Sequence, residues 1–313
     1  MPAGRAGGRA IALGPSLVTG GGGFAARHLV DLLSDSGGSV AAPPRGELDL
    51  LDADAVRRAV SELQPSAIFH LAAQSSARRS WKHPGDAVLA NLQMTANVLE
   101  AVREEAPAAH LVLVGSGQVY GDAPPLPVTE DAPLAPGNPY AVSKAAGEML
   151  AQQYETGFGL SVVRMRPFNH AGPGQSDEYV LSTMARQVAE AEARGEDEAL
   201  LRTGDVSVGR DFTDVRDVVR GYVLATGAEP GAYNVCSGRA TRVAELIEML
   251  GGAANVTARH EVDPARLRPN DALEVRGSYD RLAAATGWQP EIPLEQTVCD
   301  TLEWWRERLA AGA

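Results

Sequence analysis

The sequence has few cysteines, no long apolar run and fewer basic than acidic residues. Cys236 and Cys299 are its only two cysteines, far apart, so a disulfide scaffold is not expected and a reducing cytoplasm fits best. No run of about 18 apolar residues occurs, so no membrane span is expected. The net charge of -12 argues against a nucleic-acid partner. A phosphate-bearing small molecule stays compatible with this charge, because a local arginine cluster can occur in an acidic protein.

The first part of the chain alternates short apolar runs with helical patterns. This alternation predicts βαβ units and an α/β fold with a doubly wound parallel sheet, whose ligands bind at the carboxyl ends of the strands. After residue 170 the pattern loosens into loops and shorter helices. The predicted strands are 16–19, 39–42, 67–71, 111–115 and 160–165, and the predicted helices are 24–33, 53–63, 84–104, 139–155, 178–194, 215–225, 242–250 and 294–309.

Glycines cluster where the first predicted strand meets the first predicted helix. Gly20, Gly23 and Ala26 form the pattern G-x-x-G-x-x-A. Glycines permit a tight turn and let backbone N–H groups approach a pyrophosphate at a helix N-terminus. A flexible glycine loop is the plainer interpretation, but the strand–turn–helix context indicates dinucleotide binding. Residues 14–170 are therefore predicted as a Rossmann-type NAD(P)-binding domain, and 171–313 as a smaller, mainly substrate-binding region with some segments crossing back.

The end of the second predicted strand bears on the choice between NAD and NADP. An acid there would bind the ribose 2′-hydroxyl, and residues 40–44 contain none. Arg45 could meet a 2′-phosphate, although it could also be an ordinary surface arginine. NADP(H) is therefore favoured, with NAD(H) as the alternative. Asp49 and Leu50 are placed to contact adenine.

Tyr140 and Lys144 are four residues apart, on one face of a predicted helix. An ammonium near a phenol lowers the tyrosine pKa, so Tyr140 could exchange a proton with a sugar hydroxyl or ketone. Lys144 could also hold the nicotinamide ribose. Ser116 ends a buried strand and could polarise the reacting oxygen, or merely cap the strand end. The pair alone is a weak signal, because Tyr-x-x-x-Lys is common by chance.

Four ordered motifs together resemble those of the extended short-chain dehydrogenase/reductases, which include nucleotide-sugar epimerases, dehydratases and reductases. The motifs are Thr-Gly-x-x-Gly-Phe at 19–24, His-Leu-Ala-Ala-Gln-Ser at 70–75, Ser116 with Val-Tyr-Gly at 119–121, and Tyr140-x-x-x-Lys144. The resemblance covers about residues 16–306. It implies a catalytic set of Ser116, Tyr140 and Lys144, with cofactor contacts from Phe24, Leu71, Ala72, Ala73 and Gln74.

Four further stretches resemble the GDP-4-keto-6-deoxy-mannose reductases in particular: 166–175, 209–217, 233–238 and 268–271. This resemblance implies that Asn169, Arg210 and Arg268 hold the diphosphate and nucleotide of the substrate. A planar guanidinium suits phosphate, although a structural salt bridge with Asp211 or Asp271 is the plainer role. His170 could contact substrate or be a packed loop histidine.

The reaction class follows from the residues after Ser116. Related 4,6-dehydratases usually carry a glutamate at the second of these positions, whereas this chain has Gly117 and Gln118. Gln118 is expected to contact substrate without ionising. Neither cysteine lies near this segment in the sequence, so an epimerising cysteine is not expected. A reductase of a 4-keto-6-deoxy nucleotide sugar is favoured, with a 4-epimerase or 4,6-dehydratase as alternatives and a non-catalytic nucleotide-binding regulator as a remote one.

A homodimer is expected from the predicted helices that begin near Pro84 and Pro139. Both should carry apolar stripes on the face away from the sheet, and family members commonly pair these helices as a four-helix bundle. The alternative is that these residues pack only inward. The residues concerned are Leu89, Leu92, Val98, Met149 and Leu150. No metal site is expected.

Overall fold

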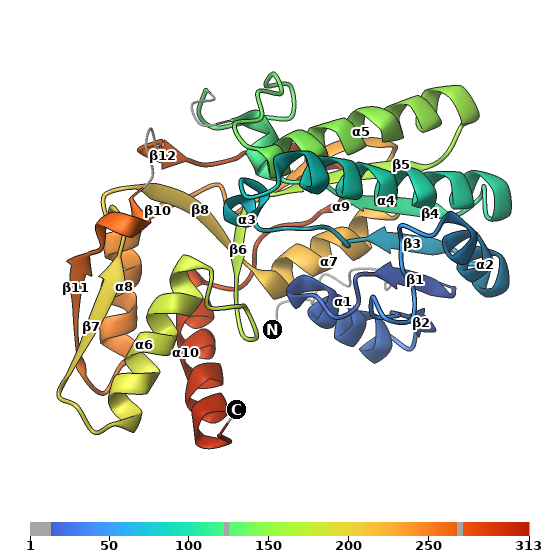
Figure 1. Ribbon diagram of the computed structural model, residues 1–313. Helices are drawn as coiled ribbons and strands as arrows, with labels where there is room; N and C mark the ends of the chain where they lie inside the picture. Colours follow the sequence, from blue (N-terminus) through green and yellow to red (C-terminus); the bar gives the residue numbers. More distant parts are fainter. Residues whose placement is uncertain (1–13, 122–124, 268–271, 313) are drawn as a thin grey trace, which may run out of the picture.

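A computed structural model describes residues 14–121, 125–267 and 272–312 of the chain. At its centre is a parallel sheet of six strands in the order β2-β1-β3-β4-β5-β9, which confirms the predicted doubly wound fold (Figure 1). The strands are β1 (Ser16–Thr19), β2 (Val40–Ala41), β3 (Ala67–His70), β4 (His110–Val114), β5 (Val162–Pro167) and β9 (Gly231–Val235).

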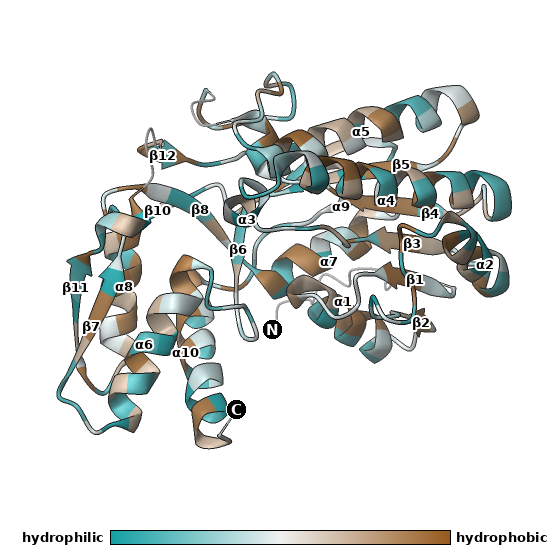
Figure 2. Cartoon of the chain, in the orientation of Figure 1, coloured by the Kyte–Doolittle hydropathy of each residue, from teal (hydrophilic) through white to brown (hydrophobic). Residues whose placement is uncertain are grey.

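Successive residues of the inner strands β1, β3, β4 and β5 face opposite sides of the sheet, because side chains alternate across it. Leu17 and Ile68 face the first core, whereas Val18 and Phe69 face the second. The first core is covered by α2 (Ala53–Leu63), α4 (Pro84–Glu105) and α5 (Pro139–Phe158). The second is covered by α1 (Phe24–Asp35), α7 (Val215–Ala225) and α9 (Asp280–Thr286). The central strands are accordingly mostly brown in Figure 2, between these two layers of helices.

Local sequence signals explain where several helices begin and end. Asp52 and Asn138 cap α2 and α5 by accepting hydrogen bonds from Ala55 N and Ala141 N. Prolines at the first turns of α4 and α5 suit helix starts, since their missing N–H would be unpaired there. Gly159 ends α5 in a left-handed conformation (φ 71°).

The second half of the chain builds a smaller lobe with its own apolar core (left in Figure 1). Strand β8 pairs antiparallel with β10 and parallel with β6 and β12, while β7 and β11 form a separate parallel pair. The elements are β6 (Asn169–Ala171), α6 (Val180–Ala193), β7 (Glu198–Thr203), β8 (Gly209–Asp214), β10 (Ala240–Arg242), α8 (Val243–Ala253), β11 (Thr257–Val262), β12 (Glu274–Val275) and α10 (Leu294–Ala310). Shorter elements are α3 (Ala77–Ser80) and two 3-10 helices, Gly117–Tyr120 and Pro264–Arg266.

One residue of the apolar stripe predicted on the outer face of α4 and α5 lies on the inner face instead. Val98 is 1% exposed and belongs to the core under α4, so its assignment to the outer face is wrong. Leu150 packs partly against the same core. Leu89 and Met149 do point outward, at 67% and 61% exposed. Across the described residues, no helix is both long enough and apolar enough to cross a membrane.

Candidate active site

Three loops leave the same edge of the central sheet and converge there. They follow β1 at Thr19, β3 at His70 and β4 at Val114, and these three strands are neighbours in the sheet. Since all three strands run parallel, their carboxyl ends lie side by side, where ligands of doubly wound sheets bind. The predicted glycine turn, the 71–74 loop and Ser116 are therefore brought together.

The glycine turn after β1 forms a cradle that larger residues would fill. Gly20 has φ +76°, and a Cβ there would lie 2.9 Å from Ala72 Cα. A Cβ on Gly21 would lie 2.2 Å from the carbonyl oxygen of Ala42, at the end of β2. Gly23 directly precedes α1 and has no side chain to cap it, which leaves first-turn amides available to an anion. These features fit the pyrophosphate of a dinucleotide.

Phe24 joins the glycine turn to the loop that follows β5. Its ring stacks on His170, with centroids 5.9 Å apart and planes 2° from parallel. His170 Nδ1 also lies 3.2 Å from the carbonyl oxygen of Phe168, and burial lowers the pKa of His170. This packing favours the packed-loop interpretation of His170 over direct substrate contact.

The residues expected at the adenine end differ in accessibility. Arg45 is exposed and, among the described residues, makes no hydrogen bond or ion pair. Asp49 is exposed and accepts a hydrogen bond from Leu51 N. Leu50 is 5% exposed within the core, and its carbonyl accepts from Asn97 Nδ2 (2.8 Å). Only Asp49 of this pair therefore presents its side chain to a ligand.

Ser116 and Tyr140 approach each other from β4 and α5. The Ser116 hydroxyl accepts a hydrogen bond from Gln118 N (3.2 Å), so Ser116 also caps the 3-10 helix that follows it. Tyr140 occupies the first turn of α5 and is almost fully buried. Burial raises the pKa of Tyr140 to about 12, and a hydrogen bond with Ser116 opposes this rise. Tyr140 is thus a protonated phenol at neutral pH.

Lys144 lies one helical turn beyond Tyr140 and hydrogen-bonds to the backbone at the end of β4. Its Nζ donates to the Val114 carbonyl oxygen (2.7 Å) and lies 6.0 Å from the centroid of the Tyr140 ring. Burial lowers the pKa of Lys144 itself to about 8. The pKa of Tyr140 is raised rather than lowered as expected, because burial of the phenol is the largest effect on it.

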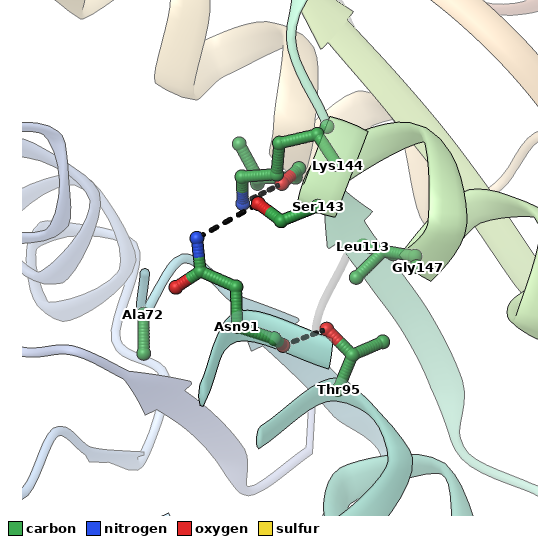
Figure 3. Close-up of a pocket in the computed structure, with 9 residues that line it drawn as sticks. Ala72, Asn91, Thr95, Leu113, Ser143, Lys144 and Gly147 are labelled. Carbon is green, nitrogen blue, oxygen red and sulfur yellow. Dashed lines mark hydrogen bonds between the residues drawn. The ribbon is translucent and has the colours of Figure 1, made fainter. Parts of the chain in front are cut away.

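The sequence analysis missed two polar residues of α4, Asn91 and Thr95, that lie beside Lys144. Asn91 on α4 accepts from Gln74 N (2.7 Å) and donates to Ser143 Oγ (2.9 Å), so it links the loop after β3 to α5. Figure 3 shows Asn91 pointing toward Ser143 beside Lys144, around a cavity of about 10 Å³ that could hold one water molecule. Asn91 and Thr95 are buried polar residues four apart in an apolar helix, a signal that could have marked them.

Gln118, the replacement for a dehydratase glutamate, contacts the start of α5. Its Oε1 accepts a hydrogen bond from Asn138 Nδ2 (3.0 Å), and Asn138 caps that helix. Tyr179, which precedes α6, was also missed; it is 42% exposed and raises the pKa of Tyr140.

The expectation about the cysteines needs a correction. Cys236 shares a core cluster with Val119 and Tyr120, so it lies near the 116–121 segment in space although not in sequence. The chain returns there because β9 pairs with β5. Cys236 is fully buried and burial raises its thiol pKa, which leaves it an unreactive thiol.

The expected substrate-binding residues lie on adjacent strands of the smaller lobe. Asn169 is exposed on β6 and pairs with Phe212 of β8, two residues from Arg210. Arg210 Nη1 donates to the carbonyl oxygens of Gly209 and Ala272. Asp211 instead accepts from Ser237 N, Gly238 N and Gly277 N, so it ties loops together. Arg268 lies outside the described residues.

Comparisons with known proteins agree with this geometry. The family model GDP-mannose 4,6 dehydratase matches residues 46–301. GDP-6-deoxy-D-mannose reductase of Pseudomonas aeruginosa is 39% identical, over 93% of this chain and 97% of its own length. The structure of RMD from Pseudomonas aeruginosa complexed with NADPH has a TM-score of 0.86 at 36% identity, covering 94% of this chain and 99% of its own. The Thermus thermophilus UDP-glucose 4-epimerase complex with NAD has a TM-score of 0.81 at 32% identity, covering 93% and 99%. The chain therefore belongs to the GDP-mannose 4,6 dehydratase family of extended short-chain dehydrogenase/reductases.

Proposed function

We propose that this protein is an NADPH-dependent reductase of a 4-keto-6-deoxy nucleotide sugar, with a GDP-sugar as the favoured substrate. The observation that carries this proposal is the place of Gln118, whose amide oxygen accepts a hydrogen bond from Asn138 Nδ2 (3.0 Å) at the start of the helix that bears Tyr140. Related 4,6-dehydratases usually carry a glutamate at this position. Elimination of water needs a carboxylate, which an amide cannot replace, whereas ketone reduction needs only a proton donor.

The cofactor would lie across the sheet edge, with its pyrophosphate on the glycine turn and first turn of α1. The 71–74 loop would border it, and Arg45 would meet the 2′-phosphate of NADPH. Relatives of this chain occur with NADPH and with NAD, so a nicotinamide cofactor is well supported. The choice of NADPH rests on exposed Arg45 and on the absence of an acid at residues 40–44.

In this proposal the chain's own residues handle the proton. The bound nicotinamide supplies the hydride. Ser116 donates a hydrogen bond to the keto oxygen and orients it toward Tyr140, whose protonated phenol then supplies the proton. Lys144 holds the nicotinamide ribose. Asn169, Arg210 and Arg268 bind the diphosphate and nucleotide portion from the smaller lobe.

Two incubations test the proposal. GDP-4-keto-6-deoxy-mannose with NADPH should give NADPH oxidation and a 6-deoxy sugar nucleotide, followed by absorbance at 340 nm and mass spectrometry. GDP-mannose alone should remain unchanged. Formation of a keto sugar from GDP-mannose would overturn the reductase in favour of a dehydratase. No NADPH oxidation in the first incubation, together with epimer formation from UDP-glucose, would overturn it in favour of an epimerase.

A further inference from the structure

Helix α5 carries a second buried charge one turn beyond Lys144. Glu148 follows Lys144 by four residues, so the two side chains lie on the same face of the helix. Glu148 is 2% exposed. Its Oε2 lies 2.8 Å from both Nε and Nη2 of Arg166 on β5. The catalytic helix is thus joined to the central sheet by a buried ion pair beside the lysine.

The other carboxylate oxygen of Glu148 has no such partner. Oε1 is buried and, within the described residues, accepts no hydrogen bond. A Cβ on Gly115 would lie 2.3 Å from Oε1, so glycine is what leaves room for this oxygen. Gly115 directly follows Val114, whose carbonyl oxygen accepts the Lys144 hydrogen bond. An unpaired buried carboxylate oxygen is costly unless a nearby positive charge compensates it.

Two other titratable side chains near Lys144 in the described part of the chain, those of His70 and Tyr140, carry no negative charge at neutral pH. His70 on β3 is neutral, because burial and then the Lys144 charge lower its pKa to about 3. Tyr140 stays protonated, since burial raises its pKa to about 12. Among the described residues, Glu148 is the charged group that favours the ammonium form of Lys144.

We propose that Glu148 is a positioning residue for the catalytic lysine: clamped by Arg166, it presents Oε1 so that Lys144 remains an ammonium against the Val114 carbonyl. Arg166 is itself held by a chain of hydrogen bonds. Arg166 Nη1 donates to the Tyr120 hydroxyl (2.8 Å), which donates to Asn234 Oδ1 (2.6 Å). The role of Lys144 in catalysis rests on the proposed function, whereas the electrostatic link between Glu148 and Lys144 can be measured without substrate.

The composition of the chain makes this measurement direct. Lys82 and Lys144 are its only two lysines, and Lys82 is exposed. Lys82→Arg therefore leaves Lys144 as the sole lysine, and lysine labelled with ¹³C at Cε gives one NMR signal that follows its titration. In this background Glu148→Gln should lower the Lys144 pKa by about one unit or more. The high-pH limb of kcat/KM should move down with it.

A matched control is available on the same two elements. Glu155 of α5 pairs with Arg164 of β5 at 3.4 Å, farther along the helix from Lys144. Glu155→Gln should leave the Lys144 signal titrating as in the Lys82→Arg parent. The proposal is overturned if Glu148→Gln leaves the titration unchanged, or if Glu155→Gln shifts it equally.

Glu148→Gln leaves the buried Arg166 charge without its partner and could therefore prevent folding. A second variant covers this case. Glu148→Gln/Arg166→Met removes both charges. Because Lys144 responds to the Glu148 charge, the Lys144 pKa should also be lower in this double variant than in the Lys82→Arg parent. An unchanged pKa in the folded double variant would also overturn the proposal. Failure of the reductase assay would count against the proposed function alone, because the NMR titration uses no substrate.

Discussion

At the scale of single residues, protonation states determine what the site can do. Tyr140 keeps its proton at neutral pH, because burial raises its pKa to about 12. Lys144 titrates near neutrality, because burial lowers its pKa to about 8. A phenol that holds its proton until the reaction begins suits reduction, in which the tyrosine gives a proton to the new alkoxide. These protonation states are therefore the ones that the proposed reductase reaction requires.

Tyr140→Phe tests that role. Loss of the phenolic proton should lower kcat by roughly a hundredfold or more while cofactor affinity stays near normal. Tyr154→Phe is the matched control, because Tyr154 lies on the same helix and its hydroxyl contacts Glu100 instead. Steady-state kinetics and cofactor titration by fluorescence check both variants. Near-normal turnover of Tyr140→Phe would rule out the assignment.

Arg45→Ala tests the cofactor preference. If Arg45 binds the 2′-phosphate, its removal should raise KM for NADPH about tenfold, equivalent to about 1.4 kcal/mol, and leave KM for NADH nearly unchanged. Arg57→Ala serves as the control, since Arg57 is an exposed arginine of α2 paired with Asp54. Equal changes in KM for NADPH and for NADH would show that Arg45 does not bind the 2′-phosphate.

At the scale of elements, the long amphipathic helices and the central strands before residue 170 were predicted, whereas the strands after residue 170, the buried β8 and β9 among them, were not. The predictions 53–63 and 215–225 coincide with α2 and α7, whose apolar residues recur at helical spacing. The helix predicted at 178–194 begins later, at Val180, because Tyr179 is extended (φ -101°, ψ 144°). Strand β7 was missed although Ala199, Leu201 and Thr203 alternate inward; β6 and β12 are too short to show alternation.

The site residues likewise divide into those that the sequence could identify and those that it could not. Motif residues such as Gly20, Ser116 and Tyr140 could be placed from sequence, because their spacing reflects local turns and helix faces. Glu148 could not, since its importance arises from Arg166 on β5. Asn91 is marked in the sequence only as a polar residue of an apolar helix, because its partner Ser143 lies on another helix. The Tyr140 pKa also depends on burial, which only the assembled fold determines.

His70 links three elements, and its variant tests their acid sensitivity. Its ring lies between Thr19 of β1 (2.8 Å) and Thr95 of α4 (3.3 Å). The folded pKa of His70 is about 3, against an ordinary 6.5, so the unfolded chain binds a proton first as pH falls. The free energy of unfolding should therefore decline between pH 6.5 and about 3.

His70→Gln should remove part of that decline, and should cost about 1 kcal/mol at neutral pH through weakened hydrogen bonds. Urea unfolding at pH 7 and at mildly acidic pH measures both effects. The exposed His260 provides the control variant, His260→Gln, which should keep the parental pH dependence. If the free energy of unfolding of His70→Gln kept the parental pH dependence, this would contradict the conclusion that His70 is buried and neutral.

At the scale of the whole molecule, several large apolar side chains are exposed on α4 and α5 or just before α4. Trp81, Leu89, Val142, Met149 and Phe158 are each at least 40% exposed. Apolar residues line a groove of about 560 Å³ between the start of α4 and the loop before α5. Exposed apolar residues around such a groove often mark an interface.

We expect a homodimer through this face. Light scattering at micromolar concentration should give twice the 32.8 kDa chain mass. Leu89→Glu/Met149→Glu should shift the protein to monomer, because it places charges in a self-complementary apolar contact. Leu200→Glu is the control, an exposed leucine (49%) of β7 in the other lobe. A monomeric parent protein would refute the expectation.

The position of β9 limits how this enzyme can be recombined with its relatives. β9 completes the central sheet beside β5, yet in the sequence it lies between β8 and β10 of the smaller lobe. The chain thus passes between the two halves repeatedly rather than through one linker. A chimera joined near residue 170 would import a foreign edge strand together with α7, and both must fit the resident core. New substrate preferences are therefore more accessible through exchange of single loops than through exchange of a whole C-terminal half.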